Sequence, residues 1–298
     1  MSNAPESAAS IYDLGYQRYQ GERIGRRQAI MTIYVEGLRG IFGLGRSSAA
    51  KIAPWTLIAI AMLPAVTVLA VSIIMGGDGD SGDIFEHHEY FSLVSLVLAL
   101  FIAIVGPDVV GRDQRNRTIS LYFSRALSRS DHVLAKYAAT TTGLLLLTLL
   151  PQAVLYAGNA LIVESFGDYV TDEAHLILPI IGSSLLASAF LAAIGLFIAS
   201  LTPRRAFATV GIILVMIVTT VVAGIMIDLD TSALALLIYL SPFDVMDGFG
   251  RFLFDVPPDD GSTLAAAGYE PFTYAIVAVG ASVVAVGLLV RHYLRLQA

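Results

Sequence analysis

Six long and nearly uncharged apolar stretches constrain this chain more than any other feature of its sequence. Each is 19 to 27 residues long, and they cover residues 54–75, 91–110, 137–163, 176–200, 206–227 and 272–290. An α-helix rises about 1.5 Å per residue and the hydrocarbon core of a bilayer is about 30 Å thick, so each stretch can cross it. A membrane β-barrel would instead show alternation in segments of about ten residues. The sequence therefore predicts an all-α membrane protein with six transmembrane helices.

The composition also indicates that the chain is embedded in a lipid bilayer. Hydrophobic residues make up 56% of the sequence and charged residues only 14%, which does not describe a water-facing surface. The chain contains no cysteine. Disulfides, thiol nucleophiles and cysteine-based zinc sites are therefore excluded.

The basic residues are segregated along the chain. All 18 Lys and Arg residues except Arg251 fall within residues 1–53, 111–136, 201–205 and 291–298. Most of the 24 acidic residues lie in the other connecting segments, 76–90, 164–175 and 228–271. Under the positive-inside rule the basic side is cytoplasmic, and an even number of spans returns the chain to it. We expect both termini in the cytoplasm.

This layout predicts three parts: a cytoplasmic N-terminal segment (1–53), a six-span transmembrane domain (54–290) and a cytoplasmic tail (291–298). Within residues 28–42 apolar side chains recur at helical spacing, which predicts an amphipathic helix along the inner membrane interface. The pattern fits equally a helix that only rests on lipid. A shorter apolar run, 233–240, ends at Ser241-Pro242 and is too short to cross. We expect it to be a re-entrant or interfacial helix.

Sequence motifs for catalysis and nucleotide binding are missing. His87-His88-Glu89 lacks the spacing that places two imidazoles around zinc, and no Gly-x-Ser-x-Gly elbow occurs. The glycine-rich stretch 40–45 leads to Arg46-Ser47 without the lysine of a phosphate-binding loop. We therefore expect no enzyme activity, no metal site, no nucleic-acid partner and no cofactor bound by this chain.

The spans carry few polar groups at intermediate depth. Gln152 and Asn159 beside Pro151 are the main ones. They favour an interhelical hydrogen bond over a contact with substrate, although a substrate path through them stays open. Ion-coupled carriers usually keep an ionisable group near the membrane midplane, and none is visible there.

Small residues in the fourth span recur at four-residue spacing. Ser184, Ser188 and Ala192 would allow two helix backbones to approach closely in lipid. The sequence predicts a packing seam there. Spacing does not distinguish a helix of the same chain from a sister subunit; the same chain is favoured because more helix faces of a six-helix bundle point inward than toward a partner.

The basic segment 111–136 between the second and third spans looks too organised for a simple connector. It carries Leu121, Tyr122, Phe123 and Leu127 among its arginines, followed by Ser128-x-x-Asp131, a pattern typical of a helix start. Basic residues at the end of a span can be topology anchors only. An apolar patch edged with positive charge nevertheless favours a docking surface for a cytoplasmic partner.

This segment resembles the cytoplasmic loop of type-2 ABC transporter permeases. The matching positions are Arg117-Thr118, Leu121-Tyr122, Ser124-Arg125-Ala126, Ser128-Arg129 and Lys136. The chain departs from the family at Ala126, where proline is frequent. The six-span layout, the amphipathic helix before the first span and the short apolar helix before the last span are also similar to that family.

The resemblance implies a permease subunit in a bacterial cell membrane that works as a pair, with a second copy or a close relative. Each permease would dock on a separate ATPase subunit, which binds the ATP and Mg. The residues implied in ATPase coupling are Arg117, Thr118, Leu121, Tyr122, Phe123, Ser124, Arg125, Leu127, Ser128 and Arg129. The resemblance implies export, and the apolar spans favour a hydrophobic or amphipathic substrate.

Two other classes of function remain as alternatives. The first is an ion-coupled secondary carrier or channel-like membrane protein. The second is an intramembrane enzyme or an assembly factor, since fold alone does not fix function.

Overall fold

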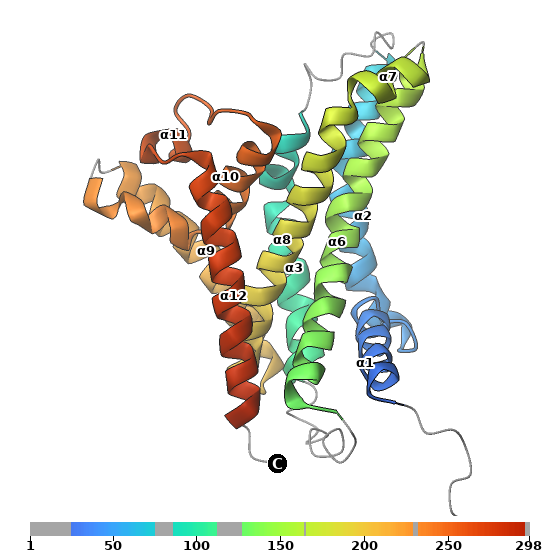
Figure 1. Cartoon of the computed structure of the whole chain (residues 1–298), viewed down its shortest axis with the longest axis vertical. Helices are drawn as coiled ribbons and strands as arrows, with labels where there is room; N and C mark the ends of the chain where they lie inside the picture. The colour runs from blue at the N-terminus through green and yellow to red at the C-terminus, as the bar shows by residue number, and fades with distance from the viewer. Residues whose placement is uncertain (1–24, 75–85, 112–126, 164, 229–231, 296–298) are drawn as a thin grey trace, which may run out of the picture.

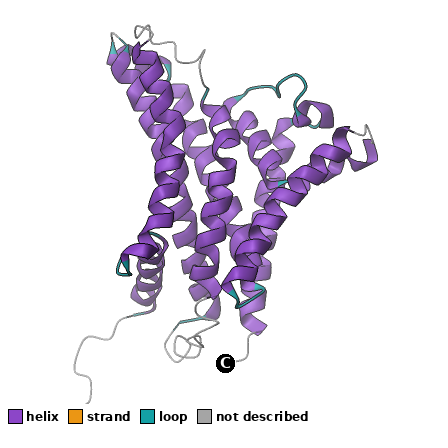
Figure 2. Ribbon diagram, turned by 180° about the vertical axis from the view of Figure 1, so that it is seen from behind, coloured by secondary structure: helices purple, strands orange, loops and turns teal. Residues whose placement is uncertain are grey.

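The computed structural model describes residues 25–74, 86–111, 127–163, 165–228 and 232–295. All regular elements in these ranges are helical, and no strand occurs among them (Figure 2). Figure 1 shows an elongated bundle with α1 (Arg26–Ile41) near one end and α7 (Phe166–Asp172) near the other. These are called the α1 end and the α7 end below.

Six helical segments are long and apolar enough to cross a membrane, as predicted. The second segment, His87–Gly111, joins a 3₁₀ turn η2 (His87–Glu89), α3 (Tyr90–Gly106) and a single π-helical turn η3 (Pro107–Gly111). The other five are α2 (Ser48–Ile74), α6 (Arg129–Ile162), α8 (Ala174–Ser200), α9 (Arg205–Asp228) and α12 (Pro271–Arg295). Helices form here because they satisfy their own backbone groups where water is absent.

The third span is longer than its apolar stretch. α6 begins at Arg129, well before residue 137, because Ser128 and Asp131 form a capping box: the Asp131 N–H donates to Ser128 Oγ (3.1 Å) and the Ser128 N–H to Asp131 Oδ2 (3.2 Å). This confirms the helix start predicted from Ser128-x-x-Asp131. The cap satisfies backbone donors that the first turn would leave free.

The six segments differ in how deeply they lie in the bundle. In the apolar window of the α3 segment 61% of the residues are buried, against 17% for α9. α3 therefore lies in the centre, in contact with α2, α8 and α9. α9 leans away from the bundle toward the α7 end, which both views show (Figures 1 and 2). α8 approaches α3 so closely that a Cβ at Gly195 would overlap Ile102.

The amphipathic segment predicted at 28–42 forms α1, which packs against α6. A Cβ at Gly37 would lie 3.1 Å from the Cβ of Ala139, and one at Gly143 would lie 3.1 Å from Ile41. The Tyr34 hydroxyl also donates to Thr142 Oγ1 (3.0 Å). After α1 the chain turns into α2 through Gly43, whose φ of +66° is rarely adopted by other residues. The placement of α1 at a membrane interface stays a prediction.

Three short helices lie between α9 and α12 at the α7 end (Figure 1). They are the 3₁₀ helix η4 (Ser232–Leu240), α10 (Pro242–Phe254) and α11 (Thr263–Ala267). The run predicted at 233–240 falls within η4, which packs on α9. α10 was not predicted. It starts at an N-cap in which Ser241 Oγ accepts from the Asp244 N–H (3.3 Å), with Pro242 in the first turn.

Candidate functional site

The residues predicted to couple to an ATPase fall into two groups. Arg117, Thr118, Leu121, Tyr122, Phe123, Ser124 and Arg125 lie outside the described residues. Leu127, Ser128 and Arg129 are described and form the start of α6. The structure thus shows the two ends from which the segment 112–126 extends.

The end next to α6 is fixed to two other helices. Leu127 is buried, and Arg129 Nη1 donates to the carbonyl oxygen of Leu294 on α12 (2.8 Å). Arg26 on α1 makes a two-pronged ion pair with Asp131, at 2.8 Å (Nε to Oδ2) and 2.9 Å (Nη2 to Oδ1). The hydrogen bond with Asp131 raises the pKa of Arg26. α1, α6 and α12 are therefore joined at this point.

The end next to α3 is held through its own backbone. Pro107 has no N–H, and the helix widens there into the π turn η3, whose carbonyl groups become available to other partners. Lys136 Nζ of α6 donates to Val109 O, and the Tyr293 hydroxyl of α12 donates to Val110 O (3.4 Å). α6 and α12 thus hold both ends of the segment 112–126.

The Asp108 carboxylate on η3 links two further elements at the α1 end, α2 and α9. It pairs with Arg46 before α2 (Nη1 to Oδ2, 3.2 Å) and with Arg205 at the start of α9 (Nη1 to Oδ1, 3.5 Å). A pocket of about 700 Å³ opens beside this cluster, and Glu36 and Lys136 also line it. Three cations face two carboxylates there, so the pocket carries a net positive charge.

The predicted substrate-path residues lie toward the α7 end. Gln152 is fully buried, and its Oε1 lies 3.3 Å from Nδ1 of His87, while the ring of Phe254 stacks on the imidazole with centroids 6.4 Å apart. Asn159 is also buried, two turns farther along α6. The Gln152 side chain therefore joins α6 to the start of the α3 segment, an interhelical contact of the kind expected from the sequence.

Several polar atoms around Gln152 lack a hydrogen-bond partner among the described residues. They are His87 Nε2, Gln152 Nε2, Tyr156 Oη and Asn159 Oδ1, all buried. Unpaired buried polar atoms are costly. This cluster is consequently the part of the bundle interior best equipped to form new hydrogen bonds.

A second polar centre at the α7 end is organised by Arg251 of α10, which is only 4% exposed. Its guanidinium pairs with Asp247 (Nε to Oδ2, 3.2 Å) and with both oxygens of Asp259, and it donates to Pro257 O (2.8 Å). Hydrogen bonding from Arg251 lowers the pKa of Asp259, whereas burial raises the pKa of Asp244 and of Asp247. The single basic residue of the acidic segment 228–271 thus fixes α10 to the loop after it.

The small residues Ser184, Ser188 and Ala192 are fully buried on α8. Ser188 Oγ lies 3.2 Å from Thr148 Oγ1 of α6, and the Tyr137 hydroxyl of α6 donates to Ala189 O (3.2 Å). The partner helix at this seam is therefore α6 of the same chain.

Sequence reasoning missed His87, Tyr156, Arg251 and Asp259 as members of polar clusters. A histidine pair directly before an apolar run could have indicated His87, since such a position lies at the rim of a bundle. The isolation of Arg251 among acids could have indicated an internal ion pair. Among the described residues, no group of three or more His, Cys, Asp or Glu side chains could hold a metal ion.

The fold and its polar clusters define a class of protein, a multi-pass helical membrane protein with six spans. No protein-family model and no curated protein matches this chain.

Proposed function

We propose that this chain is the permease subunit of an ATP-driven ABC transporter that exports a hydrophobic or amphipathic substrate. A separate ATPase subunit docks on residues 111–136, and the α1 end faces the cytoplasm. The observation that carries the proposal is the anchoring of the described residues on both sides of the segment 112–126. Its ends are held by Arg129 to α12 and by Lys136 to η3. Movement of a partner docked on this segment would be transmitted through these contacts to the spans, including α6 and α12.

The proposed orientation draws on the charges of the described residues. Arg251 lies at the α7 end. The other described Lys and Arg residues belong to α1 or lie near those ends of the spans that are at the α1 end: Arg26, Arg27, Arg39, Arg46, Lys51, Arg129, Lys136, Arg204, Arg205, Arg291 and Arg295. Because the chain has no cysteine, single cysteines report orientation directly. Ser81→Cys, Gly167→Cys and Ser262→Cys should react with an impermeant reagent from outside, and Ser7→Cys, Ser120→Cys and Gln297→Cys should not. The reverse labelling pattern would reject the orientation.

The docking proposal is tested by co-purification with an ATPase that contains a phosphate-binding loop, followed by Leu121→Asp or Phe123→Asp. Each change would bury an unpaired charge in the docked interface, so transport should be lost while ATP hydrolysis and membrane insertion persist. Leu121→Met keeps an apolar side chain of similar volume and serves as the matched control. Transport at the wild-type rate in both aspartate variants would reject the docking role.

The assembly is proposed to contain two permease chains and two ATPase chains. The second permease is another copy of this chain or a close relative. Mass measurement of the detergent-solubilised complex checks this number directly. A particle with one permease and a bound ATPase would contradict the pair while leaving the docking proposal intact.

An ion-coupled carrier is the second candidate function, favoured by one observation. His87 is an ionisable group buried beside Gln152, with its Nε2 unpaired among the described residues. Carriers use such groups to bind and release a driving ion. Transport that persists without ATP and stops on addition of an ionophore would establish this function instead.

A further inference from the structure

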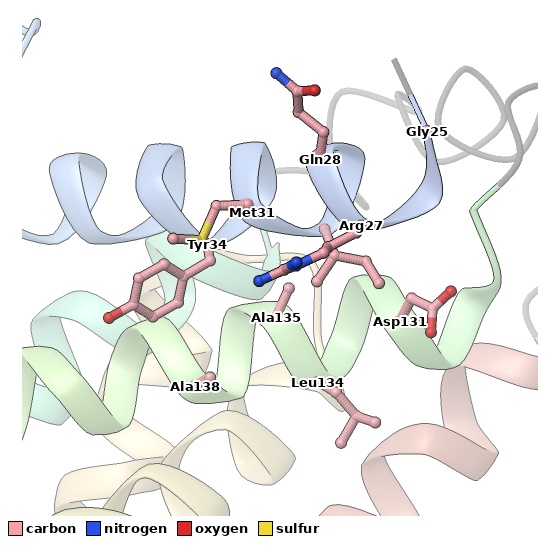
Figure 3. A pocket seen from close by; sticks show the side chains of 10 residues that line it. Gly25, Arg27, Gln28, Met31, Tyr34, Asp131, Leu134, Ala135 and Ala138 are labelled. Carbon is pink, nitrogen blue, oxygen red and sulfur yellow. The ribbon is translucent and has the colours of Figure 1, made fainter. Parts of the chain in front are cut away.

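A groove runs between α1 and the first turns of α6 (Figure 3). It encloses about 890 Å³, within the range of about 300–1,000 Å³ typical of ligand pockets. Its walls are mainly apolar: Ile30, Met31, Tyr34, Leu134, Ala135 and Ala138. Figure 3 shows Met31 and Tyr34 reaching from α1 toward α6, where Ala135 and Ala138 leave space because they are small.

The apolar walls of the groove are open on the outer surface of the bundle. On α6 the exposed residues Leu134 and Ala138 lie one turn apart on the same helix face. Leu134 is 45% exposed, and Met31 on the opposite wall is 58% exposed. An acyl chain that enters the groove therefore meets exposed apolar side chains on both helices.

The rim of the groove is positively charged. Arg27 lies between α1 and α6 in Figure 3 and makes no hydrogen bond or ion pair with the described residues. The nearby carboxylate, Asp131, is already paired with Arg26 through both of its oxygens. α1 also starts without a side-chain cap and without an acidic residue in its first turn. Arg27 and the positive N-terminal end of α1 can therefore bind an anion.

We propose that this groove binds an anionic phospholipid of the leaflet at the α1 end. One acyl chain lies between α1 and α6, and the headgroup phosphate is bound by Arg27. The assignment combines the exposed apolar walls of the groove with the charge of Arg27, which no carboxylate among the described residues neutralises. It goes beyond the proposed function and does not depend on it, because it requires only that α1 lies at the membrane surface.

Native mass spectrometry of the full-length chain tests the proposal. The detergent-solubilised protein is offered equal amounts of phosphatidylglycerol and phosphatidylcholine with identical acyl chains. One arginine at an anionic lipid should give about a fivefold preference for phosphatidylglycerol. Arg27→Gln should abolish the preference. Arg39→Gln is the matched control, since Arg39 lies on the same helix but faces Glu36 at 3.4 Å, and it should keep the preference.

The acyl site is tested separately by filling it. Ala138→Phe should lower the retention of both lipids, because the ring occupies the space left by the small side chain. Leu150→Phe, at an exposed position of α6 away from the groove, should retain them. Equal retention of the two lipids by the wild-type chain, or undiminished binding to Ala138→Phe, would overturn the proposal.

Other occupants are distinguished by a photoactivatable crosslinker on Ala138→Cys, the single thiol in the molecule, with the full-length chain in bilayers. Adducts with phospholipid support the proposal. Crosslinks to residues 1–24 of the same chain, or to a second protein, would show that protein fills the groove and would reject the lipid site.

Discussion

The two ends of the bundle hold their charges in opposite ways. At the α1 end, Asp108 is shared by Arg46 and Arg205, and all three side chains are partly exposed, between 22% and 52%. At the α7 end, Arg251 forms ion pairs with Asp247 and Asp259, and its side chain is only 5% exposed. Among the described residues, cations exceed carboxylates at the first end and carboxylates exceed cations at the second. Charge at the α1 end is therefore available to partners, whereas Arg251 stabilises the fold.

Arg251→Ala should have the largest effect. It leaves Asp247, which is largely buried, without its counter-ion and frees the loop held through Pro257. Breaking a buried ion pair from one side costs about 3–5 kcal/mol. The free energy of unfolding in detergent, followed by circular dichroism, measures this loss. Arg39→Ala removes the exposed pair with Glu36 and should cost less than about 1 kcal/mol. Equal losses would erase the contrast between buried and exposed pairs.

Gly248→Ala should have the next largest effect. A Cβ at this position of α10 would overlap the buried ring of Tyr274 on α12. Overpacking of this kind typically costs about 1–3 kcal/mol. Gly37→Ala is the counterpart at the α1 end, where the nearest atom would be Ala139 Cβ at 3.1 Å. Higher helix propensity offsets that milder contact. A thermal midpoint lowered more by Gly37→Ala would reverse the ranking of the two ends.

Asp108→Asn should have a smaller effect than either change at the α7 end. It weakens two pairs that are partly exposed, and exposed pairs contribute up to about 1 kcal/mol each. The substitution also leaves Arg46 and Arg205 without a counter-ion beside the 700 Å³ pocket. Chemical denaturation in detergent should show a loss near 1 kcal/mol. A loss as large as that of Arg251→Ala would mean that Asp108 is equally structural.

The smallest effect concerns pH and belongs to the α7 end. Burial raises the pKa of Asp244 above its unfolded value, so its contribution to stability grows as the pH falls through that folded pKa. Hydrogen bonding from Arg251 lowers the pKa of Asp259, so its contribution is lost as the pH falls below the ordinary Asp value of about 4. Stability should therefore rise on mild acidification and then fall. Asp244→Asn should reduce the rise in stability on mild acidification and leave the loss at lower pH unchanged. An unchanged rise would show that Asp244 does not cause it.

The spans could be predicted from the sequence because each is a continuous apolar run, and hydropathy alone defines such helices. Their ends do not follow from hydropathy. α6 starts at Arg129 because a capping box extends it through polar residues, and α2 starts at Ser48 before its apolar run. α10 was missed because Gly248 and Gly250 are poor helix formers and two aspartates interrupt its apolar sequence. The Ser-Pro-x-Asp start at 241–244 was the available signal.

The candidate site could be predicted only where its parts are adjacent in sequence. Ser128 and Asp131 lie within one helical turn, and their capping box was predicted from spacing. His87 and Gln152 are brought together by the packing of two spans, and no local pattern encodes that contact. The hydrogen bond from Lys136 Nζ to Val109 O likewise depends on the π turn at Pro107. A single sequence specifies the helices but not which side chains meet between them.

α6 is a rod-like helix of 34 residues, roughly 51 Å long, with Pro151 inside it, and it is held near one end by Lys136. Gln152 lies on the same rod, roughly 24 Å from that pivot. A tilt of about 5° around Lys136 would displace Gln152 by about 2 Å, more than its 3.3 Å hydrogen bond with His87 can accommodate. The His87–Gln152 bond is therefore a gauge of the angle of α6, intact in one orientation of the rod and broken in another.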